Sequence, residues 1–447
     1  MMFLSRSSPA RRRTSAPVEQ RSPRAQARLL SQVVAGCRRL LSERGESNSV
    51  AIAEEVLGLY AGLTAEQRLA FFKVLDTEFG PDPKAVLDAA QRYAEEPEAT
   101  RLMALVQAAE PPRQELLRRL NRAPGGTAVI IGMRRALLDL LKHQPALAAV
   151  EADFLHLLSS WFNPGFLQME QVDWRSPAAL LEKIIQHEAV HEIDGWADLR
   201  RRLQPDRRCF AFFHPQLPGE PLIFVEVALV PDMPAAVGPL INARDEPQSD
   251  ERQFKVATFY SISNCQPGLK GVSLGNFLIK RVAEHLQREF PQLHTFCTLS
   301  PIPGFSAWLH KHAPGLRERE DLAPKLKERA LKALAALVQH GGEPAALASL
   351  EPAKASEPLR EALSTLAAFY LAHESVTPRG DPVAKFHLGN GARLERINWA
   401  GDLSRKGLKQ ALGLMVNYLY DLRHIEDHHE RFVHGEVVAS RALQRLL

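Results

Sequence analysis

One stretch, residues 255–299, constrains the fold more than any other part of the chain. Residues 255–262 (KVATFYSI) are rich in β-branched and aromatic side chains, which is typical of a buried strand. After a loop, apolar residues recur from Asn276 with the period of a helix, and Pro291 ends that pattern. Residues 294–299 (HTFCTL) have the composition of a second strand. The stretch therefore predicts a strand–loop–helix–strand unit.

The loop of this unit contains three glycines, Gly268, Gly271 and Gly275. Backbone amides at such a loop and at the following helix N-terminus favour an anionic phosphate group. The sequence is neither a P-loop, because no Gly-Lys-Ser/Thr follows, nor a GxGxxG dinucleotide loop. Residues 270–275 (KGVSLG) instead resemble the Q/R-x-x-G-x-G/A loop with which GNAT acyltransferases hold the pyrophosphate of coenzyme A. Lys270 replaces Gln/Arg and Ser273 replaces the first glycine, so an ordinary strand–helix turn is the alternative.

Several uncommon sequence blocks follow in one order: FYSIS, GLKGVSLGNFLIKRV, LSPIPGF, FHLGNGARLERINWAGD and GLMVNY. Together they resemble the malonyl-CoA decarboxylase family, over a region that runs with gaps from about Gln186 to about Tyr420. The resemblance implies a multi-domain α and α/β protein, with an all-helical N-terminal bundle followed by a GNAT-like mixed-sheet catalytic domain. It also implies conversion of malonyl-CoA to acetyl-CoA and CO₂, a reaction of fatty acid metabolism, without a metal or organic cofactor.

The resemblance assigns catalytic roles to Ser300 in the SPIPGF block and His387 in the FHLGNGA block, and it places Asn417 and Tyr420 in or behind the pocket. From the residues alone, serine before proline often only begins a turn, and a lone histidine in a strand is more often structural. The residues expected to hold coenzyme A are Lys270, Gly271, Val272, Ser273, Leu274, Gly275 and Asn276.

Malonyl-CoA can lose CO₂ unaided by a cofactor because its thioester carbonyl lies β to the carboxylate and can accept the electrons as an enolate. The enzyme then needs a grip on coenzyme A, hydrogen bonds to the enolate oxygen and a proton donor for the α-carbon. An arginine clamp on the carboxylate would stabilise the ground state and raise the barrier. His387, with an ordinary pKa of ~6.5, suits proton donation near neutral pH, and Ser300 is expected at the reacting end. Which of the two delivers the proton is left open.

A separate pattern, HEAVH at residues 187–191, has the form of the zinc-binding HExxH motif. On one helix, His187 and His191 could chelate zinc with Glu188 as the base. Asp194 stands where metzincins need a glycine, and it also suits a helix N-cap. We therefore expect no metal here, as the family resemblance also implies.

Composition divides the chain into parts. Residues 1–24 form an Arg-rich tail, for which disorder is favoured over an organelle-targeting peptide. Residues 25–163 have a helical pattern broken by Gly and Pro, which predicts a bundle that serves as a scaffold or oligomerisation domain. After a linker at 163–166, residues 167–447 are expected to form the catalytic domain, with a helical insertion at about 306–380.

Within the catalytic domain, residues 208–214 and 222–229 are expected to pair as an antiparallel hairpin. Residues 386–392 are interpreted as a short strand that enters a glycine turn. Residues 407–422 are interpreted as a helix that contains Asn417.

Charge and cysteine content limit the kinds of binding partner and the cell compartment that the sequence predicts. The net charge of +4 is concentrated in residues 1–28, which hold seven Arg and one Glu, so no nucleic-acid surface is predicted. No apolar run is long enough to span a bilayer, and four scattered cysteines without a secretory signal indicate a cytoplasmic protein with reduced thiols. We expect a homo-oligomer, a dimer or tetramer, built through the helical domain. The alternative functions are a GNAT-type acyl-CoA-dependent acyltransferase and a non-catalytic helical interaction protein.

Overall fold

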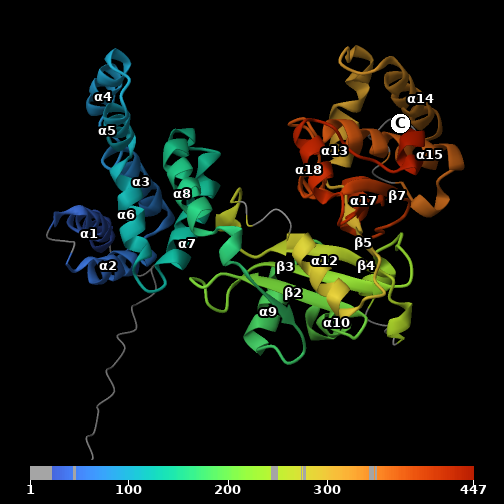
Figure 1. Ribbon diagram of the computed structural model, residues 1–447, viewed down its shortest axis with the longest axis horizontal. Coiled ribbons are helices and arrows are strands. Elements are labelled where there is room, and N and C mark those ends of the chain that lie inside the picture. The colour runs from blue at the N-terminus through green and yellow to red at the C-terminus, as the bar shows by residue number, and fades with distance from the viewer. Residues whose placement is uncertain are drawn as a thin grey trace, which may run out of the picture. The chain divides into compact units, whose positions relative to one another are not determined.

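The computed structural model describes residues 23–43, 47–242, 250–272, 274, 278–341, 347 and 350–447 (Figure 1). It falls into two units. The first holds the described residues up to Asn163 together with Gln266–Val272, and the second holds those of Pro164–Cys265 and Ser273–Leu447. Most of the tail expected at residues 1–24 lies outside the described part.

Eight α-helices make up the described part of the first unit, which confirms the predicted helical N-terminal region. Their bounds are α1 Pro23–Leu41, α2 Ser49–Ala61, α3 Ala65–Thr77, α4 Pro83–Glu95, α5 Ala99–Ala109, α6 Pro112–Asn121, α7 Gly126–Leu141 and α8 Ala148–Trp161. Thr64 begins α3 with a capping box: its hydroxyl accepts from the Gln67 N–H, and the Gln67 side chain accepts from the Thr64 N–H. Phe71, Phe72 and Phe154 are among the buried side chains of the core.

The first half of the glycine loop packs within this helical unit. A short 3-10 turn at Pro267–Leu269 lies against α7. The buried guanidinium of Arg134 in α7 donates from Nη1 to the Gly268 carbonyl oxygen and from Nη2 to the Lys270 carbonyl oxygen, each at 2.7 Å. A Cβ on Gly268 would lie 2.2 Å from the Ile131 carbonyl oxygen, so this packing requires glycine. The helices therefore hold the backbone of this loop, a role that the sequence pattern did not predict.

The second unit is organised around a mixed eight-stranded sheet with the order β1-β2-β3-β4-β5-β8-β6, in which β7 also pairs with β8. The strands are β1 Gln168–Val172, β2 Arg207–Phe213, β3 Pro221–Val230, β4 Val256–Asn264, β5 Thr295–Thr298, β6 Ser300–Pro301, β7 Arg393–Asn398 and β8 Met415–Leu419. In the described residues β4 and β5 run parallel and the other pairs are antiparallel. The predicted β2–β3 hairpin and the predicted central strands are confirmed.

Three helices flank this sheet: α9 (Ala178–His187), α10 (Gly195–Arg202) and α12 (Leu278–Glu289). Helix α12 connects β4 to β5 and covers one face, where His285 and Arg281 contact Phe210 and Phe212 of β2. The alternate residues of β2 face the other side, into a core with α9 and α10. The predicted strand–loop–helix–strand unit is therefore present, and residues 273 and 275–277 of its loop lie outside the described part.

The remaining helices of the second unit are α11 Gly238–Ile241, α13 Phe305–Lys311, α14 Pro324–Gly341, α15 Glu357–Phe369, α16 Pro382–Gly389, α17 Arg405–Ala411, α18 Ile425–Val433 and α19 Arg441–Leu446. A π-helical turn at Tyr370–Glu374 follows α15. Helices α13, α14 and α15 occupy the stretch where a helical insertion is predicted. Among the described helices, none has both the length and the apolar character to cross a membrane.

The expected strand at residues 386–392 is wrong. His387 lies in the last turn of α16, and this helix begins with a strong local signal. Oδ1 of Asp381 accepts hydrogen bonds from the N–H groups of Val383 at 2.9 Å and Ala384 at 3.1 Å, and Pro382 occupies the first helical position. The interpretation as a strand missed this Asp-Pro helix start.

The expected single helix at residues 407–422 is also wrong. Helix α17 ends at Ala411, because Leu412 and Gly413 adopt left-handed conformations with φ of 55° and 83°. The following MVNYL segment forms β8, as its β-branched and aromatic residues favour. Asn417 therefore lies in the sheet.

Candidate active site

A cavity opens in the second unit where the two parallel strands diverge. The β4–β5 pairing ends at Phe259 and Thr298. Beyond this point β4 continues to Asn264, whereas the segment after β5 forms β6 and pairs with β8. The cavity has a volume of about 310 Å³. It is lined by Val190, Ile223, Phe259, Tyr260, Ser261, Ile262, Asn264, Ser300, Pro301, Pro382, Val383, Phe386 and His387. Both residues predicted to be catalytic line this one cavity.

Ser300 is placed by β6 and by the rigid turn that follows it. The turn ends at Gly304, where a Cβ would lie 2.1 Å from the Tyr370 hydroxyl. The Gly304 N–H donates to Oδ2 of Asp381 at 2.8 Å. Because Asp381 also caps α16, one carboxylate fixes both the turn after Ser300 and the helix that carries His387.

His387 stands in the middle of a chain of hydrogen bonds. Its Nε2 lies 3.1 Å from Ser300 Oγ, and its Nδ1 lies 2.9 Å from the Tyr420 hydroxyl. The Ser300 hydroxyl donates to Thr298 Oγ1 at 2.9 Å, so it accepts a hydrogen bond from the His387 Nε2–H. In this tautomer Nδ1 is the acceptor for the Tyr420 hydroxyl. The hydrogen bonds therefore run from Tyr420 through His387 and Ser300 to Thr298.

Burial keeps the side chains of this hydrogen-bond chain uncharged. His387 is only 3% exposed, and desolvation lowers its pKa to about 3. Desolvation also raises the pKa of Tyr420 well above its ordinary value. The Tyr418 ring stacks on the imidazole with 4.6 Å between ring centroids. His387 is therefore a neutral imidazole at neutral pH, which corrects the expectation of an ordinary histidine pKa.

The two residues predicted in or behind the pocket occupy different layers. Tyr420 contacts His387 directly. Asn417 is buried one layer further out: its Nδ2 donates to the Thr298 carbonyl oxygen at 2.7 Å, and its Oδ1 accepts from Asn398 Nδ2 at 2.8 Å. Asn417 thus supports the strand segment whose Thr298 side chain accepts the Ser300 hydrogen bond.

The residues expected to hold coenzyme A are only partly described. Lys270, Gly271 and Val272 belong with the helical unit, where Lys270 is exposed and Gly271 has a φ of 81° that favours glycine. Leu274 is buried. Outside the described residues lie Ser273, Gly275 and Asn276. Coenzyme A binding by this loop stays a prediction.

The HEAVH sequence does not form the helix that a zinc site of this type needs. Helix α9 ends at His187, and the Glu188 side chain closes the turn that follows. Its Oε1 accepts from the N–H groups of Val190 and His191, both at 2.8 Å. The two histidines therefore do not lie one helical turn apart on a common face.

Sequence reasoning missed a serine that lines this cavity and the carboxylate that accepts its hydrogen bond. Ser261 of β4 lines the cavity together with Ser300 and His387. Its hydroxyl donates to Glu188, with oxygen–oxygen distances of 2.8 and 2.7 Å. The strand pattern of FYSISN signals that Ser261 and Ser263 share one face. No sequence pattern pairs Ser261 with Glu188, since the two are 73 residues apart.

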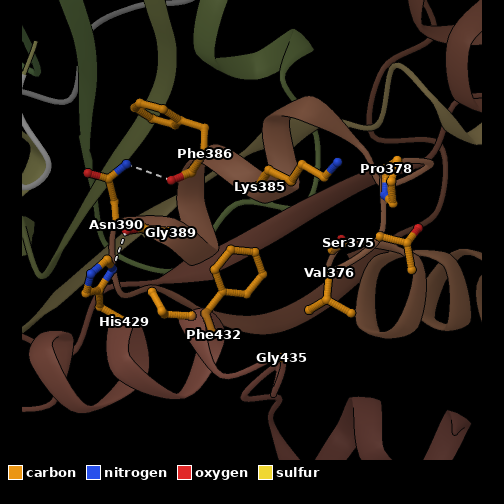
Figure 2. A pocket seen from close by; sticks show the side chains of 12 residues that line it. Ser375, Val376, Pro378, Lys385, Phe386, Gly389, Asn390, His429, Phe432 and Gly435 are labelled. Carbon is orange, nitrogen blue, oxygen red and sulfur yellow. Dashed lines mark hydrogen bonds between the residues drawn. The ribbon is translucent and has the colours of Figure 1, made fainter. Parts of the chain in front are cut away.

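A larger hollow of about 700 Å³ lies beside α16 (Figure 2). It is lined by Ser375, Val376, Thr377, Pro378, Lys385, Phe386, Gly389, Asn390, His429, Phe432, Val433 and Gly435. Asn390 Nδ2 donates to the Phe386 carbonyl oxygen at 2.6 Å, and His429 Nδ1 lies 2.7 Å from the Gly389 carbonyl oxygen. Phe386 borders both hollows, but Ser300 and His387 line the smaller one, which is therefore the candidate reaction site.

Comparison with known proteins agrees with these features. Residues 165–447 match the family model described as "Malonyl-CoA decarboxylase C-terminal domain", and residues 79–162 match "Malonyl-CoA decarboxylase N-terminal domain". The chain is 38% identical over 392 residues to a mitochondrial malonyl-CoA decarboxylase of Mus musculus, covering 82% of this chain and 79% of that one. It is 36% identical over 397 residues to a relative of the same name from Anser anser anser, covering 82% and 77%.

Solved structures extend the likeness to the fold. The crystal structure of malonyl-CoA decarboxylase from Rhodopseudomonas palustris is similar with a TM-score of 0.82 at 45% identity, covering 93% of this chain and 99% of that one. That from Agrobacterium vitis gives a TM-score of 0.79, also at 45% identity and with the same coverage. The chain belongs to the malonyl-CoA decarboxylase family of carboxy-lyases.

Proposed function

We propose that the protein decarboxylates malonyl-CoA to acetyl-CoA and CO₂, with Ser300 and His387 as the catalytic pair. The observation that carries the proposal is their contact: Nε2 and Oγ lie 3.1 Å apart, and both side chains line the cavity between the diverging strands. Family membership supports malonyl-CoA as the substrate.

The reaction breaks the bond between the carboxylate carbon and the α-carbon. Its electron pair passes to the α-carbon and the thioester carbonyl, CO₂ leaves, and the resulting enolate takes up one proton at carbon. The thioester carbonyl is thus the electron sink, so the chemistry calls for neither a metal nor an organic cofactor. Hydrogen bonds that strengthen as the enolate oxygen gains charge lower the barrier.

Ser300 is suited to make such a hydrogen bond. It accepts from His387, so its own proton can turn from Thr298 toward a thioester oxygen or an enolate carbon in the cavity. The neutral state of His387 does not prevent proton delivery, because the α-carbon of a thioester enolate is a stronger base than the alkoxide that Ser300 leaves when it donates its proton, and the His387 Nε2–H stabilises that alkoxide. A neutral imidazole polarising a carbonyl is an established catalytic device. Tyr420 fixes the tautomer at the far end.

The cavity wall also suits a carboxylate that must lose its charge. None of the residues that line it, all within the described part of the chain, is Lys or Arg. A cationic clamp would favour the ground state over a transition state in which the carboxylate becomes neutral CO₂. The apolar lining instead weakens solvation of the carboxylate and so favours its loss.

The glycine loop and the helical unit have proposed roles of their own. We infer that the backbone amides of Lys270–Asn276 hold the coenzyme A pyrophosphate. Copies of the chain are proposed to associate through the helical unit. Helices α4 and α5 have no buried residue, and Leu87, Met103 and Val106 on them are 58%, 64% and 60% exposed. Light scattering on the protein as it elutes from a size-exclusion column tests this association. A dimer or tetramer supports it, and a monomer at micromolar concentration contradicts it.

The decarboxylase proposal is tested by incubating the protein with malonyl-CoA in D₂O, with a chelator and without any acyl acceptor. One CO₂ and one acetyl-CoA should form per malonyl-CoA, with one deuterium in the acetyl methyl group. Absence of CO₂ contradicts the proposal. Release of free coenzyme A only when an amine is added would instead support the acyltransferase alternative.

A further inference from the structure

Glu188 is a buried carboxylate whose described partners are hydroxyl and backbone N–H groups. It is 8% exposed. Both of its oxygens accept from the Ser261 hydroxyl, Oε2 also accepts from Ser263 at 3.2 Å, and Oε1 accepts from two backbone N–H groups. Burial of a carboxylate against neutral partners costs free energy that an apolar side chain of similar size would not cost. Its presence here therefore calls for a functional reason.

The reason lies in what Glu188 does to the cavity wall. Ser261 lines the cavity on the β4 side, whereas Ser300 and His387 line it from β6 and α16. A serine hydroxyl has one proton, and in Ser261 that proton is donated to Glu188. Ser261 can therefore offer the cavity only oxygen lone pairs, with a carboxylate directly behind them.

We propose that Glu188 is a positioning residue for decarboxylation: it holds Ser261 so that its oxygen, and not its proton, faces the malonyl group. The inference rests on the proposed decarboxylase function. A free hydroxyl proton at this wall would bind the malonyl carboxylate in the ground state, and that hydrogen bond would weaken as the carboxylate becomes CO₂. Because the Ser261 oxygen can only accept hydrogen bonds, it does not bind the carboxylate in this way. The thioester oxygen is then the group that binds at Ser300 and His387. The ground-state carboxylate therefore gains no stabilisation that would be lost in the transition state.

The substitution Glu188→Gln tests this role, because an amide keeps the volume but removes the second acceptor oxygen and the charge. We expect kcat for malonyl-CoA to fall by about ten- to a hundred-fold, as loss of a charge-assisted hydrogen bond would allow. KM for malonyl-CoA should stay unchanged or fall, since a ground-state hydrogen bond to the carboxylate becomes possible. The inhibition constant of acetyl-CoA, which has no carboxylate, should stay within about two-fold of wild type. A purely structural role would instead move KM and the acetyl-CoA constant together.

Two serine variants separate positioning from folding. Ser263→Ala removes another partner of the same carboxylate, but Ser263 does not line the cavity, so its kcat should stay within about two-fold of wild type. Ser261→Ala removes the oxygen lone pairs that keep the malonyl carboxylate away from this wall, so it should lower kcat with the acetyl-CoA constant unchanged. In the Ser261→Ala background, Glu188→Gln should change kcat by less than about two-fold, because Glu188 acts through Ser261.

An equal loss of kcat from Glu188→Gln in both backgrounds would overturn the inference. If Glu188→Gln does not fold, Ser261→Ala alone decides, and a wild-type kcat there would contradict the role of Ser261 and hence of Glu188. The wild-type protein separates this inference from the proposed function. If wild type releases no CO₂, the proposed function fails. If wild type is active and Glu188→Gln matches it in kcat and KM, only the Glu188 inference fails.

Discussion

The Asp381 carboxylate accepts a hydrogen bond from the Gly304 N–H at 2.8 Å and so ties the turn after Ser300 to the helix that carries His387. The two catalytic candidates come from segments 87 residues apart, and their 3.1 Å contact depends on the relative placement of β6 and α16. A single buried side chain holds both, which makes Asp381 a sensitive point of the site.

Replacement of Asp381 should therefore damage catalysis as well as stability. Asp381→Asn keeps one acceptor oxygen for the α16 cap but faces the Gly304 N–H with an amide donor. We expect kcat to fall by at least ten-fold, with the free energy of unfolding lower by about 1–3 kcal/mol, the cost of an unsatisfied buried polar group. Asp82→Asn is the matched control, because Asp82 also caps a helix before a proline but is exposed. If both variants retain wild-type kcat, the coupling through Asp381 is wrong.

The helical unit offers a second test. Arg134→Ala removes the donors to the Gly268 and Lys270 carbonyl oxygens, and it should weaken coenzyme A binding by roughly ten-fold because the loop backbone loses its support. Arg113→Ala is the control. Both arginines are buried and pair with a carboxylate on α8, Arg134 with Glu151 and Arg113 with Asp153, but Arg113 donates to the Leu75 carbonyl oxygen instead of the loop. Calorimetric titration with coenzyme A below the unfolding transition measures both. Equal affinities in the two variants would contradict the loop assignment.

The sequence predicts most of this fold, but not the contacts that hold Ser300 and His387 in one cavity. The strand–loop–helix–strand unit was predictable because each element has its own composition and period. The pattern of the block that contains His387 favours a strand, whereas Asp381 and Pro382 begin a helix, so the resemblance to the family singles out the residue but not its geometry. Glu188, Asp381 and Arg134 act through contacts between distant segments, and no local pattern reports such contacts. The pKa of His387 depends on burial, which a sequence does not show.

The pH dependence of turnover should reflect a neutral His387. Because burial lowers its pKa to about 3, this imidazole does not change charge between pH 5 and 8 in the free enzyme. We therefore expect no change in kcat/KM near pH 6.5 that arises from protonation of His387. The profile should have the same shape, at lower amplitude, in His387→Asn. A wild-type limb near pH 6.5 that disappears in this variant would mean that His387 titrates as an ordinary histidine.

The same burial makes stability depend on pH in a defined direction. The folded-state pKa values of His387 and His191 are lowered by burial to about 3 and about 4, below an unfolded value of ~6.5. Between these values the unfolded chain binds more protons, so stability is full above pH ~6.5 and is lost as the pH falls toward 4. Urea unfolding midpoints at pH 7.5, 6 and 5 should fall less steeply in His387→Asn than in wild type. The exposed His434, replaced by Asn, should keep the wild-type slope; if all three proteins share one slope, His387 is not buried as a neutral group.

The central claim is that Ser300 and His387 act as one unit on malonyl-CoA, and turnover of the two single variants and the double variant tests it most directly. His387→Asn should lower kcat by about 10²–10⁴-fold with coenzyme A affinity little changed, and Ser300→Ala should lower kcat more than affinity. Because the two side chains share one hydrogen bond, the double variant should be scarcely slower than the slower single variant. Near-wild-type turnover in either single variant would remove that residue from the reaction, and full additivity in the double variant would contradict the claim that the two act together.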